Sequence, residues 1–195
     1  MYRRYDEVTS SKRLYNAHAG RPWGLGDAAT AFPTGLDGFS DRDSGVVYLN
    51  GRSGVPTTTP HEILHVNSSS EFVSAVGDAI NEGMTEELAL DALAAAGVRL
   101  PAVAHYPQER ALVSELTTVG GRDRMVRAYF QGGQSLAEFI AAVGPDTFQE
   151  VKGAADAHNA SAAIKLLRGH GAGQAGAVST ATAQTVDADT VEEGR

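Results

Sequence analysis

The chain has 195 residues, of which 42% are hydrophobic, and its formal net charge is −8. This length suits one domain with tails, and the negative charge argues against a nucleic-acid partner. There is no cysteine, which excludes disulfide bonds and thiolate zinc sites and leaves His, Asp and Glu as candidate metal ligands.

The N-terminus carries Arg3 and Arg4 with no apolar stretch after them, and no segment is long and apolar enough to span a membrane. We therefore expect no membrane partner, and a protein that is cytoplasmic or exported without a signal peptide. The sequence does not predict an oligomeric state.

The first fifty residues predict an arm, a loop-rich stretch and a strand. Residues 1–20 are polar and basic and predict an N-terminal arm, with the folded domain expected at 21–168. Residues 20–45 are rich in glycine and proline, which form turns. Residues 45–50 are β-branched and aromatic between turn residues, a pattern that predicts a strand.

A helix is predicted to begin at Thr59, with Thr59 as its N-cap and Pro60 at the first helical position. Glu62 then lies three residues after the N-cap. In this frame Thr59 and Glu62 form a capping box, in which each side chain binds the backbone of the other residue. This is an ordinary structural role for Glu62, and it explains neither His61 nor His65.

The rest of the chain is predicted to be helical up to residue 167. Residues 67–70 break the first helix, and Gly77 and Gly83 are weak points that could divide the next one. The expected helices are 71–96, 108–119, 122–130, 135–143 and 147–167. Residues 169–195 are small and polar and predict a disordered tail. The predicted fold class is therefore α+β and mostly helical, with a small N-terminal sheet.

Residues 61–65 form an HExxH motif. On a helix His61 and His65 lie one turn apart, so both rings can reach one metal ion. Glu62 lies beside them, placed to take a proton from a water held by that ion. Glu82 follows at a distance that lets an antiparallel helix bring back a third ligand. The pattern predicts one Zn²⁺ per chain, held by His61, His65 and Glu82.

Further acids and donors surround this predicted site. Glu86 lies one turn after Glu82 and is expected to accept a hydrogen bond from the second nitrogen of a ligand histidine. Asp78, one turn before Glu82, is the main rival for either role. Either His105 or Tyr106 is expected to stabilise an oxyanion, although Tyr106 could equally be a half-buried loop tyrosine.

The motif at 61–65, followed by Asn-Glu-Gly-Met-Thr at 81–85, resembles the gluzincin metallopeptidases, and most closely their aminopeptidase-like branch. The resemblance implies a zincin fold with His61, His65 and Glu82 as zinc ligands and Glu62 as general base. It also implies that Glu86 orients a histidine, and that a downstream Tyr or His stabilises the oxyanion.

In this family the substrate adds as an extra strand beside the active-site helix, which implies substrate binding along Val47, Tyr48 and Leu49. The Gly-x-Met-Glu-Asn motif with which the aminopeptidases recognise a free N-terminus is absent. The short chain therefore resembles a minimal bacterial zincin, of the kind found in toxin or effector domains.

The sequence predicts a zinc-dependent endopeptidase that acts on a protein or peptide. Two alternatives stay open. One is a module that binds metal without catalysis. The other is a protease effector or toxin delivered by an injection system, for which the signal-free tails are the only sequence correlate.

Overall fold

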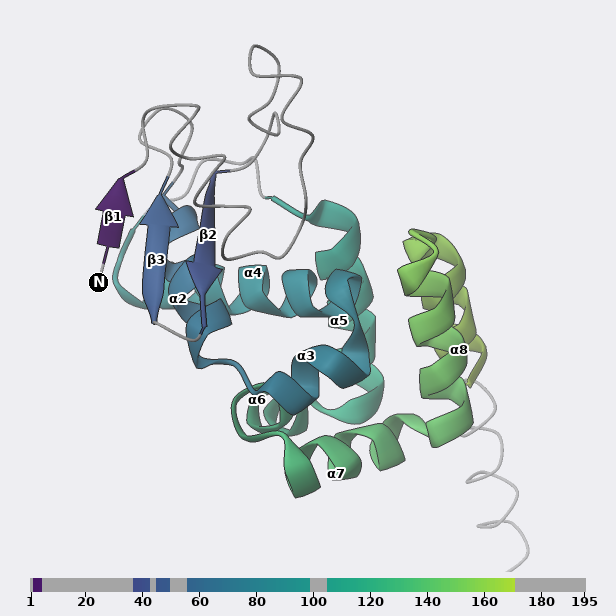
Figure 1. The fold of residues 1–195 in the computed structure, drawn as a ribbon. Helices are drawn as coiled ribbons and strands as arrows, with labels where there is room; N and C mark the ends of the chain where they lie inside the picture. The colour runs from purple at the N-terminus through teal and green to yellow at the C-terminus, as the bar shows by residue number, and fades with distance from the viewer. Residues whose placement is uncertain (1, 5–36, 43–44, 50–55, 99–104, 171–195) are drawn as a thin grey trace, which may run out of the picture.

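The protein is described by a computed structural model that covers residues 2–4, 37–42, 45–49, 56–98 and 105–170 (Figure 1). Most of these residues are helical, and a small sheet lies at the N-terminal end of the molecule, which confirms the mostly helical α+β class. Most of the predicted arm, most of the glycine-rich stretch and residues 171–195 of the predicted tail lie outside the described residues.

The sheet has three strands in the order β1-β3-β2: β1 is Tyr2–Arg4, β2 is Gly38–Asp41 and β3 is Val46–Leu49. The strand predicted at 45–50 is thus β3, and it is the middle strand. It pairs in parallel with β1 and antiparallel with β2. In the described part of the chain β2 has a strand partner on one side only, so β2 is an outer strand.

The helices follow as a continuous series in which none of the described members is long and apolar enough to cross a membrane. They are α2 (Thr58–Asn67), α3 (Ser70–Val76), α4 (Asp78–Ala95), α5 (Pro107–Gly120), α6 (Arg122–Gln131), α7 (Gly133–Val143), α8 (Pro145–Asp156) and a last helix at 160–170. The last helix passes residue 168, so the predicted boundary between domain and tail lies inside it.

Two glycines end helices where the sequence predicts breaks. Gly77 has φ +79° and separates α3 from α4. Gly97 has φ +73° and ends α4, where Val98 N–H donates to the Leu93 carbonyl in the Schellman pattern. A positive φ is strained for other residues, so the sequence marks these two ends by itself.

The start of α2 differs from the prediction. Its first residue is Thr58 and its N-cap is Thr57, which makes no side-chain capping hydrogen bond. The Thr57 carbonyl accepts the first helical bond from His61 N–H at 2.9 Å. Glu62 is therefore the fifth helical residue, and the predicted capping box of Thr59 and Glu62 is wrong. Glu62 therefore has no capping role at the start of α2.

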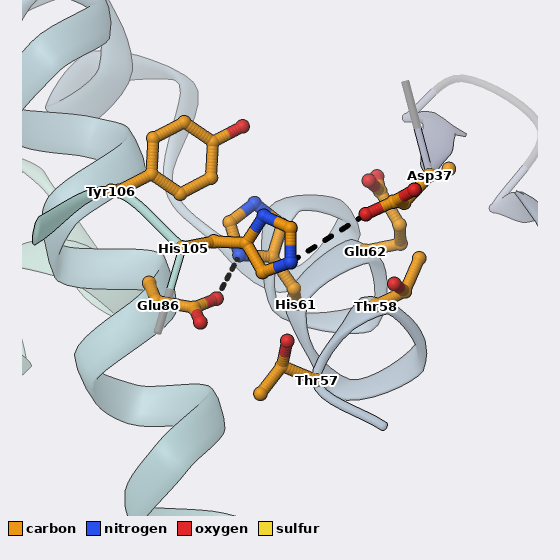
Figure 2. Close-up of a pocket in the computed structure, with 9 residues that line it drawn as sticks. Asp37, Thr57, Thr58, His61, Glu62, Glu86, His105 and Tyr106 are labelled. Atoms are coloured by element: carbon orange, nitrogen blue, oxygen red, sulfur yellow. Dashed lines mark hydrogen bonds and ion pairs between the residues drawn. The ribbon is translucent and has the colours of Figure 1, made fainter. Parts of the chain in front are cut away.

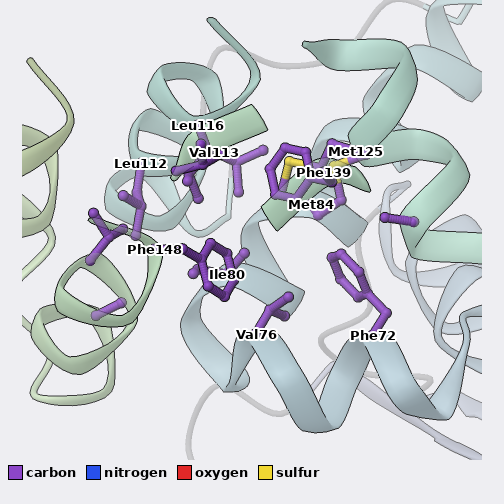
Figure 3. Close-up of a cluster of buried hydrophobic side chains, with 14 of the residues drawn as sticks. Phe72, Val76, Ile80, Met84, Leu112, Val113, Leu116, Met125, Phe139 and Phe148 are labelled. Carbon is purple, nitrogen blue, oxygen red and sulfur yellow. The ribbon is translucent and has the colours of Figure 1, made fainter. Parts of the chain in front are cut away.

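The hydrophobic core surrounds one face of α4 (Figure 3). Ile80 and Met84 of α4 are fully buried, with Phe72 of α3 and Leu112 and Leu116 of α5 in the same cluster. The other face of α4 packs against α2. Helix α4 is thus anchored by the core, and its Glu82 and Glu86 contact the helix that carries the two histidines.

Gly83 lies inside α4 without breaking it, contrary to the weak point that the sequence suggests. A Cβ added at Gly83 would lie 2.5 Å from the carbonyl oxygen of Glu109 in α5 and 3.0 Å from a methyl group of Val113. The glycine lets the two helices approach closely, one residue away from Glu82.

We expect Gly83→Ala to destabilise the protein by about 2 kcal/mol, because the methyl group must push α5 away, and overpacking of this kind costs roughly 1–3 kcal/mol. Gly153→Ala in α8 is the matched control, since nothing lies within 4 Å of its added Cβ. Alanine there should stabilise the helix by about 0.5–1 kcal/mol. Urea unfolding of both variants measures the difference. Equal stabilisation by the two alanines would show that α4 and α5 can accommodate an extra methyl group at residue 83.

Candidate metal centre

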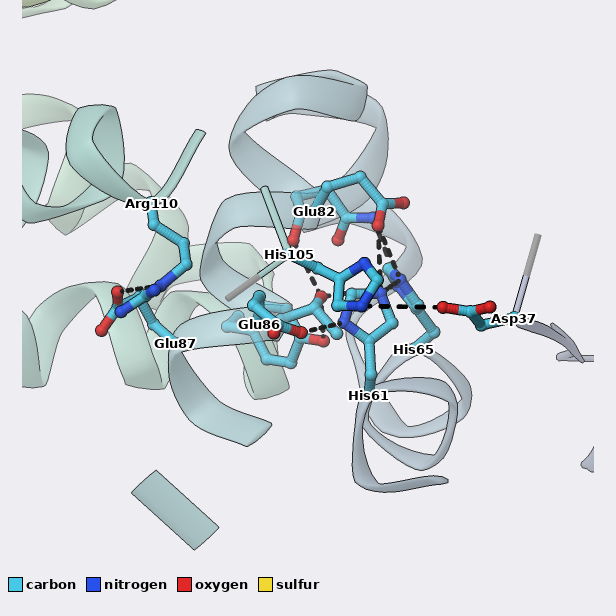
Figure 4. A network of polar contacts seen from close by, with 11 residues as sticks. Asp37, His61, His65, Glu82, Glu86, Glu87, His105 and Arg110 are labelled. Carbon is cyan, nitrogen blue, oxygen red and sulfur yellow. Dashed lines mark hydrogen bonds and ion pairs between the residues drawn. The ribbon is translucent and has the colours of Figure 1, made fainter. Parts of the chain in front are cut away.

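Two helices bring the three predicted ligands together (Figure 4). His61 and His65 lie on successive turns of α2, and Glu82 faces them from α4. The Nε2 atoms of the two histidines are 3.0 Å apart. Glu82 Oε2 lies 3.1 Å from His61 Nε2 and 3.4 Å from His65 Nε2. These three atoms form a group that could hold a metal ion.

The spacing of the three atoms suits zinc. Zinc binds nitrogen and oxygen ligands at about 2.0–2.1 Å in a tetrahedron, which places ligand atoms about 3.3–3.4 Å apart. The observed separations run from 3.0 to 3.4 Å. The three atoms could therefore form one face of a coordination tetrahedron around a metal ion.

Glu86 orients the first ligand. Its carboxylate is 1% exposed, and its Oε2 accepts a hydrogen bond of 3.0 Å from His61 Nδ1. That bond fixes the proton on Nδ1 and leaves Nε2 to face a metal. Glu86 lies where the sequence predicts a supporting acid. Its other oxygen, Oε1, is buried and has no hydrogen-bond partner among the described residues.

The second ligand is supported by residues that the sequence analysis missed. His65 Nδ1 lies 3.4 Å from the Asn81 side-chain nitrogen and 3.5 Å from Thr85 Oγ1. Thr85 donates to the Asn81 carbonyl at 2.8 Å, so Tyr129 O–H donates to Thr85, also at 2.8 Å. The spacing of Asn81 and Thr85 on one helix turn was a usable signal. Tyr129, on α6, gave none.

The predicted base, Glu62, is buried beside the metal group, with 8% of its surface exposed. Burial raises the pKa of its carboxyl group, and positive charge on His65 and His61 opposes this. A hydrogen bond with Ser40 of β2 also acts against the rise. No sequence pattern indicated a role for Ser40. A raised pKa makes a carboxyl group a better proton acceptor, as a general base requires.

The two candidate oxyanion donors are placed differently. Tyr106 is the N-cap of α5 in the left-handed conformation, with φ +55°, and its ring stacks on His61 at 5.5 Å. Burial and then the charge and hydrogen bond of Glu82 raise the pKa of its phenol. His105 instead faces Asp37, with His105 Nε2 3.6 Å from Asp37 Oδ2. The structure thus brings Tyr106 to the metal group and His105 to the rim.

The other acids of α4 and the predicted substrate residues do not belong to the group of possible ligands among the described residues. Asp78, the rival ligand, is in the first turn of α4, and the group of possible ligands contains Glu82 instead. Glu87 pairs with Arg110 at 2.7 Å. The predicted substrate residues Val47, Tyr48 and Leu49 lie on β3, whose two edges are occupied by β1 and β2. The backbone of β3 therefore has no edge for a further strand.

The pKa values of His61 and Glu82 depend strongly on the charges and hydrogen bonds of their neighbours. Burial alone would lower the pKa of His61, but its hydrogen bonds to Glu82 and Glu86 and the charges of Glu82 and Glu62 outweigh this and raise it to about 9. Burial of Glu82 acts to raise its pKa, but the hydrogen bonds and charges of His61 and His65 prevail and hold it well below the ordinary value of 4.5. In the metal-free protein His61 is therefore protonated at neutral pH, and its positive charge balances the neighbouring carboxylates as a bound metal ion would.

This coupling predicts opposite pH dependences for the metal-free fold and for metal binding. The raised pKa of His61 stabilises the metal-free fold fully below pH 6.5, and this contribution is lost as the pH rises towards 9. The lowered pKa of Glu82 stabilises it above pH 4.5, and this contribution is lost on acidification. We expect the melting temperature of the metal-free protein to fall as the pH rises from 6.5 to 9.

Zinc must displace the His61 proton, so zinc affinity should rise about tenfold per pH unit over the same range and level off above pH 9. Thermal melts of chelator-treated protein and competition titrations with a zinc indicator test the two trends. A zinc affinity that is flat across this range would contradict the assignment of His61 as a ligand.

No protein-family model, curated protein or solved structure matches the chain. The resemblance of residues 61–65 and 81–85 to the gluzincins therefore stays a prediction.

Proposed function

We propose that the chain is a zinc-dependent peptidase that hydrolyses internal peptide bonds of a protein or peptide. The observation that carries the proposal is the triangle of His61, His65 and Glu82 with Glu62 buried beside it. The donor set of two imidazoles and one carboxylate is typical of catalytic zinc, which keeps one position for a water or substrate.

The zinc ion, when bound, would acidify a water molecule and polarise the scissile carbonyl group. The protein's own contribution begins with orientation. Glu86 fixes the His61 ring, and Asn81 and Thr85 border the His65 ring. Because α4 is packed into the core on its other face, Glu82 and Glu86 are held rigidly opposite α2.

Glu62 is proposed to accept the proton of the attacking water and to deliver it to the departing amine. Two features support this role. Its raised pKa lets it hold the proton between the two transfers. Its hydrogen bond with Ser40 ties the carboxyl group to β2.

Tyr106 is proposed to donate a hydrogen bond to the oxyanion that develops on the substrate. Its raised pKa keeps the phenol protonated at neutral pH, which a donor requires. Its left-handed backbone is unusual for a residue other than glycine, and such strain is often found at functional sites. His105 is the weaker candidate because its ring faces Asp37.

An extended substrate is proposed to pair with β2, since β3 is the middle strand. Ser40 of β2 bonds with Glu62, and Asp37 and Gly38 at the start of β2 line the pocket beside His61. The outer strand of the sheet therefore leads directly to the proposed base.

The proposal is tested by measuring zinc content by mass spectrometry and hydrolysis of a mixed peptide library by the purified protein. We expect about one zinc per chain, cleavage at internal bonds, loss of cleavage with a chelator and recovery on addition of zinc. Tight zinc binding with no cleavage of any peptide or folded protein would instead favour the non-catalytic module.

A further inference from the structure

A pocket opens beside the metal group, with a volume of about 350 Å³ that includes the open space at its mouth (Figure 2). Its lining comes from the start of β2, the first turns of α2, α4 and the segment before α5. The residues concerned are Asp37, Gly38, Thr57, Thr58, His61, Glu62, Glu86, His105 and Tyr106. Because Glu62 and Tyr106 belong to this lining, a side chain in the pocket would lie next to the proposed reaction centre.

The lining is acidic and rich in hydrogen-bonding groups. It holds three carboxyl groups, those of Asp37, Glu62 and Glu86, and none of its described residues is lysine or arginine. Its two histidines, His61 and His105, carry positive charge only when protonated. An acidic ligand side chain would meet repulsion here, and an apolar one would strip water from carboxylates without replacing their hydrogen bonds.

Glu86 independently indicates that the pocket lacks a hydrogen-bond donor, which a ligand could supply. One of its oxygens binds His61, while Oε1 is buried and has no partner among the described residues. A buried carboxylate oxygen without a hydrogen bond costs free energy, so such atoms in folded proteins usually meet a donor. The Glu86 carboxyl group faces the same pocket as Asp37.

At the rim, the ion pair that Asp37 makes within the described part of the chain is a long one. Its contact with His105 spans 3.6 Å, and the histidine side chain is 40% exposed. A cationic group that enters the pocket can therefore replace His105 at Asp37 and form a shorter, charge-assisted hydrogen bond.

From these observations we propose that the pocket binds a lysine or arginine side chain of the substrate, next to the scissile bond, with Asp37 as the residue that determines this specificity. The inference rests on the proposed peptidase function. In this arrangement the cationic head group bonds to Asp37, and Glu86 Oε1 in the same lining is a further acceptor for its N–H groups.

The test compares a cleaved peptide that carries arginine next to the scissile bond with the same peptide carrying citrulline, its neutral isostere. Lysine against acetyl-lysine tests the second cation. For the wild type we expect kcat/KM to be about 10–100-fold higher for the cation, as one charged hydrogen bond is worth roughly 1.5–3 kcal/mol. Asp37→Asn should reduce the ratio to near one, because the preference for the cation is lost with the carboxylate.

Asp91→Asn is the matched control. It removes the same charge from an exposed acid of α4 that pairs with Arg122 outside the pocket lining. This variant should keep the full preference for the cation, which separates a local effect of Asp37 from a change in net charge.

A binding arm uses the zinc-loaded protein and NMR titration with acetyl-arginine amide and acetyl-citrulline amide. Tighter binding of the arginine amide, lost in Asp37→Asn, supports the inference whether or not hydrolysis is seen. Equal binding of the two amides overturns the inference. Hydrolysis with equal kcat/KM for both peptides also overturns it and leaves the peptidase function standing. Absence of all hydrolysis with selective arginine binding would overturn the peptidase function alone.

Discussion

Glu62→Gln is expected to abolish peptide hydrolysis while leaving zinc bound. The amide keeps the shape of the side chain but cannot accept a proton, and general base catalysis contributes about 10²–10⁴-fold to a rate. We therefore expect kcat to fall by at least about a hundredfold with one zinc per chain retained. The measurement is kcat on a cleaved peptide, together with zinc content.

The melting temperature of Glu62→Gln is a second measurement on this variant. Glu62 is buried and burial raises the pKa of its carboxyl group, so its charged form is costly in the fold. A neutral amide should leave the melting temperature unchanged or raise it. A capping role would instead lower it, because loss of a cap costs about 1 kcal/mol.

Glu87→Gln is the control for this experiment. Glu87 is an acid of α4 that pairs with Arg110 and does not belong to the metal group. Its variant should retain both zinc and activity. Full activity in Glu62→Gln would remove Glu62 from the mechanism and, with it, the main support for a hydrolytic function.

Glu82→Gln is expected to weaken zinc binding by at least about a hundredfold. Structural zinc sites with four ligands bind with about 10–16 kcal/mol, so loss of one ligand should cost on the order of 3 kcal/mol. The expected weakening follows from Glu82 Oε2 being the only carboxylate oxygen in the group of possible ligands among the described residues. A competition titration with a zinc indicator measures the change.

Asp78→Asn is the matched control, because Asp78 lies one turn before Glu82 on the same helix and was the rival candidate in the sequence. It should bind zinc as the wild type does. The ligand assignment would be wrong if Asp78→Asn lost zinc and Glu82→Gln kept it.

The sequence alone predicted what depends on local spacing. Residues 61–65 place two histidines on one helical face because a helix has 3.6 residues per turn, and the same rule places Glu82 and Glu86 together. Gly77 and Gly97 end helices because they take a positive φ that other residues avoid. The strand at 45–50 followed from its β-branched residues and flanking turns.

Other features were decided only by the tertiary structure. Gly83 lies in an unbroken helix against which α5 packs, and β3 is a middle strand because the distant β1 pairs with it on the side opposite β2. Ser40 and Asp37 reach the centre from the sheet. Side-chain periodicity is a property of neighbouring residues, whereas such contacts depend on which distant backbone segments pack together. The sequence therefore determined the candidate ligands, and only the fold decided what surrounds them.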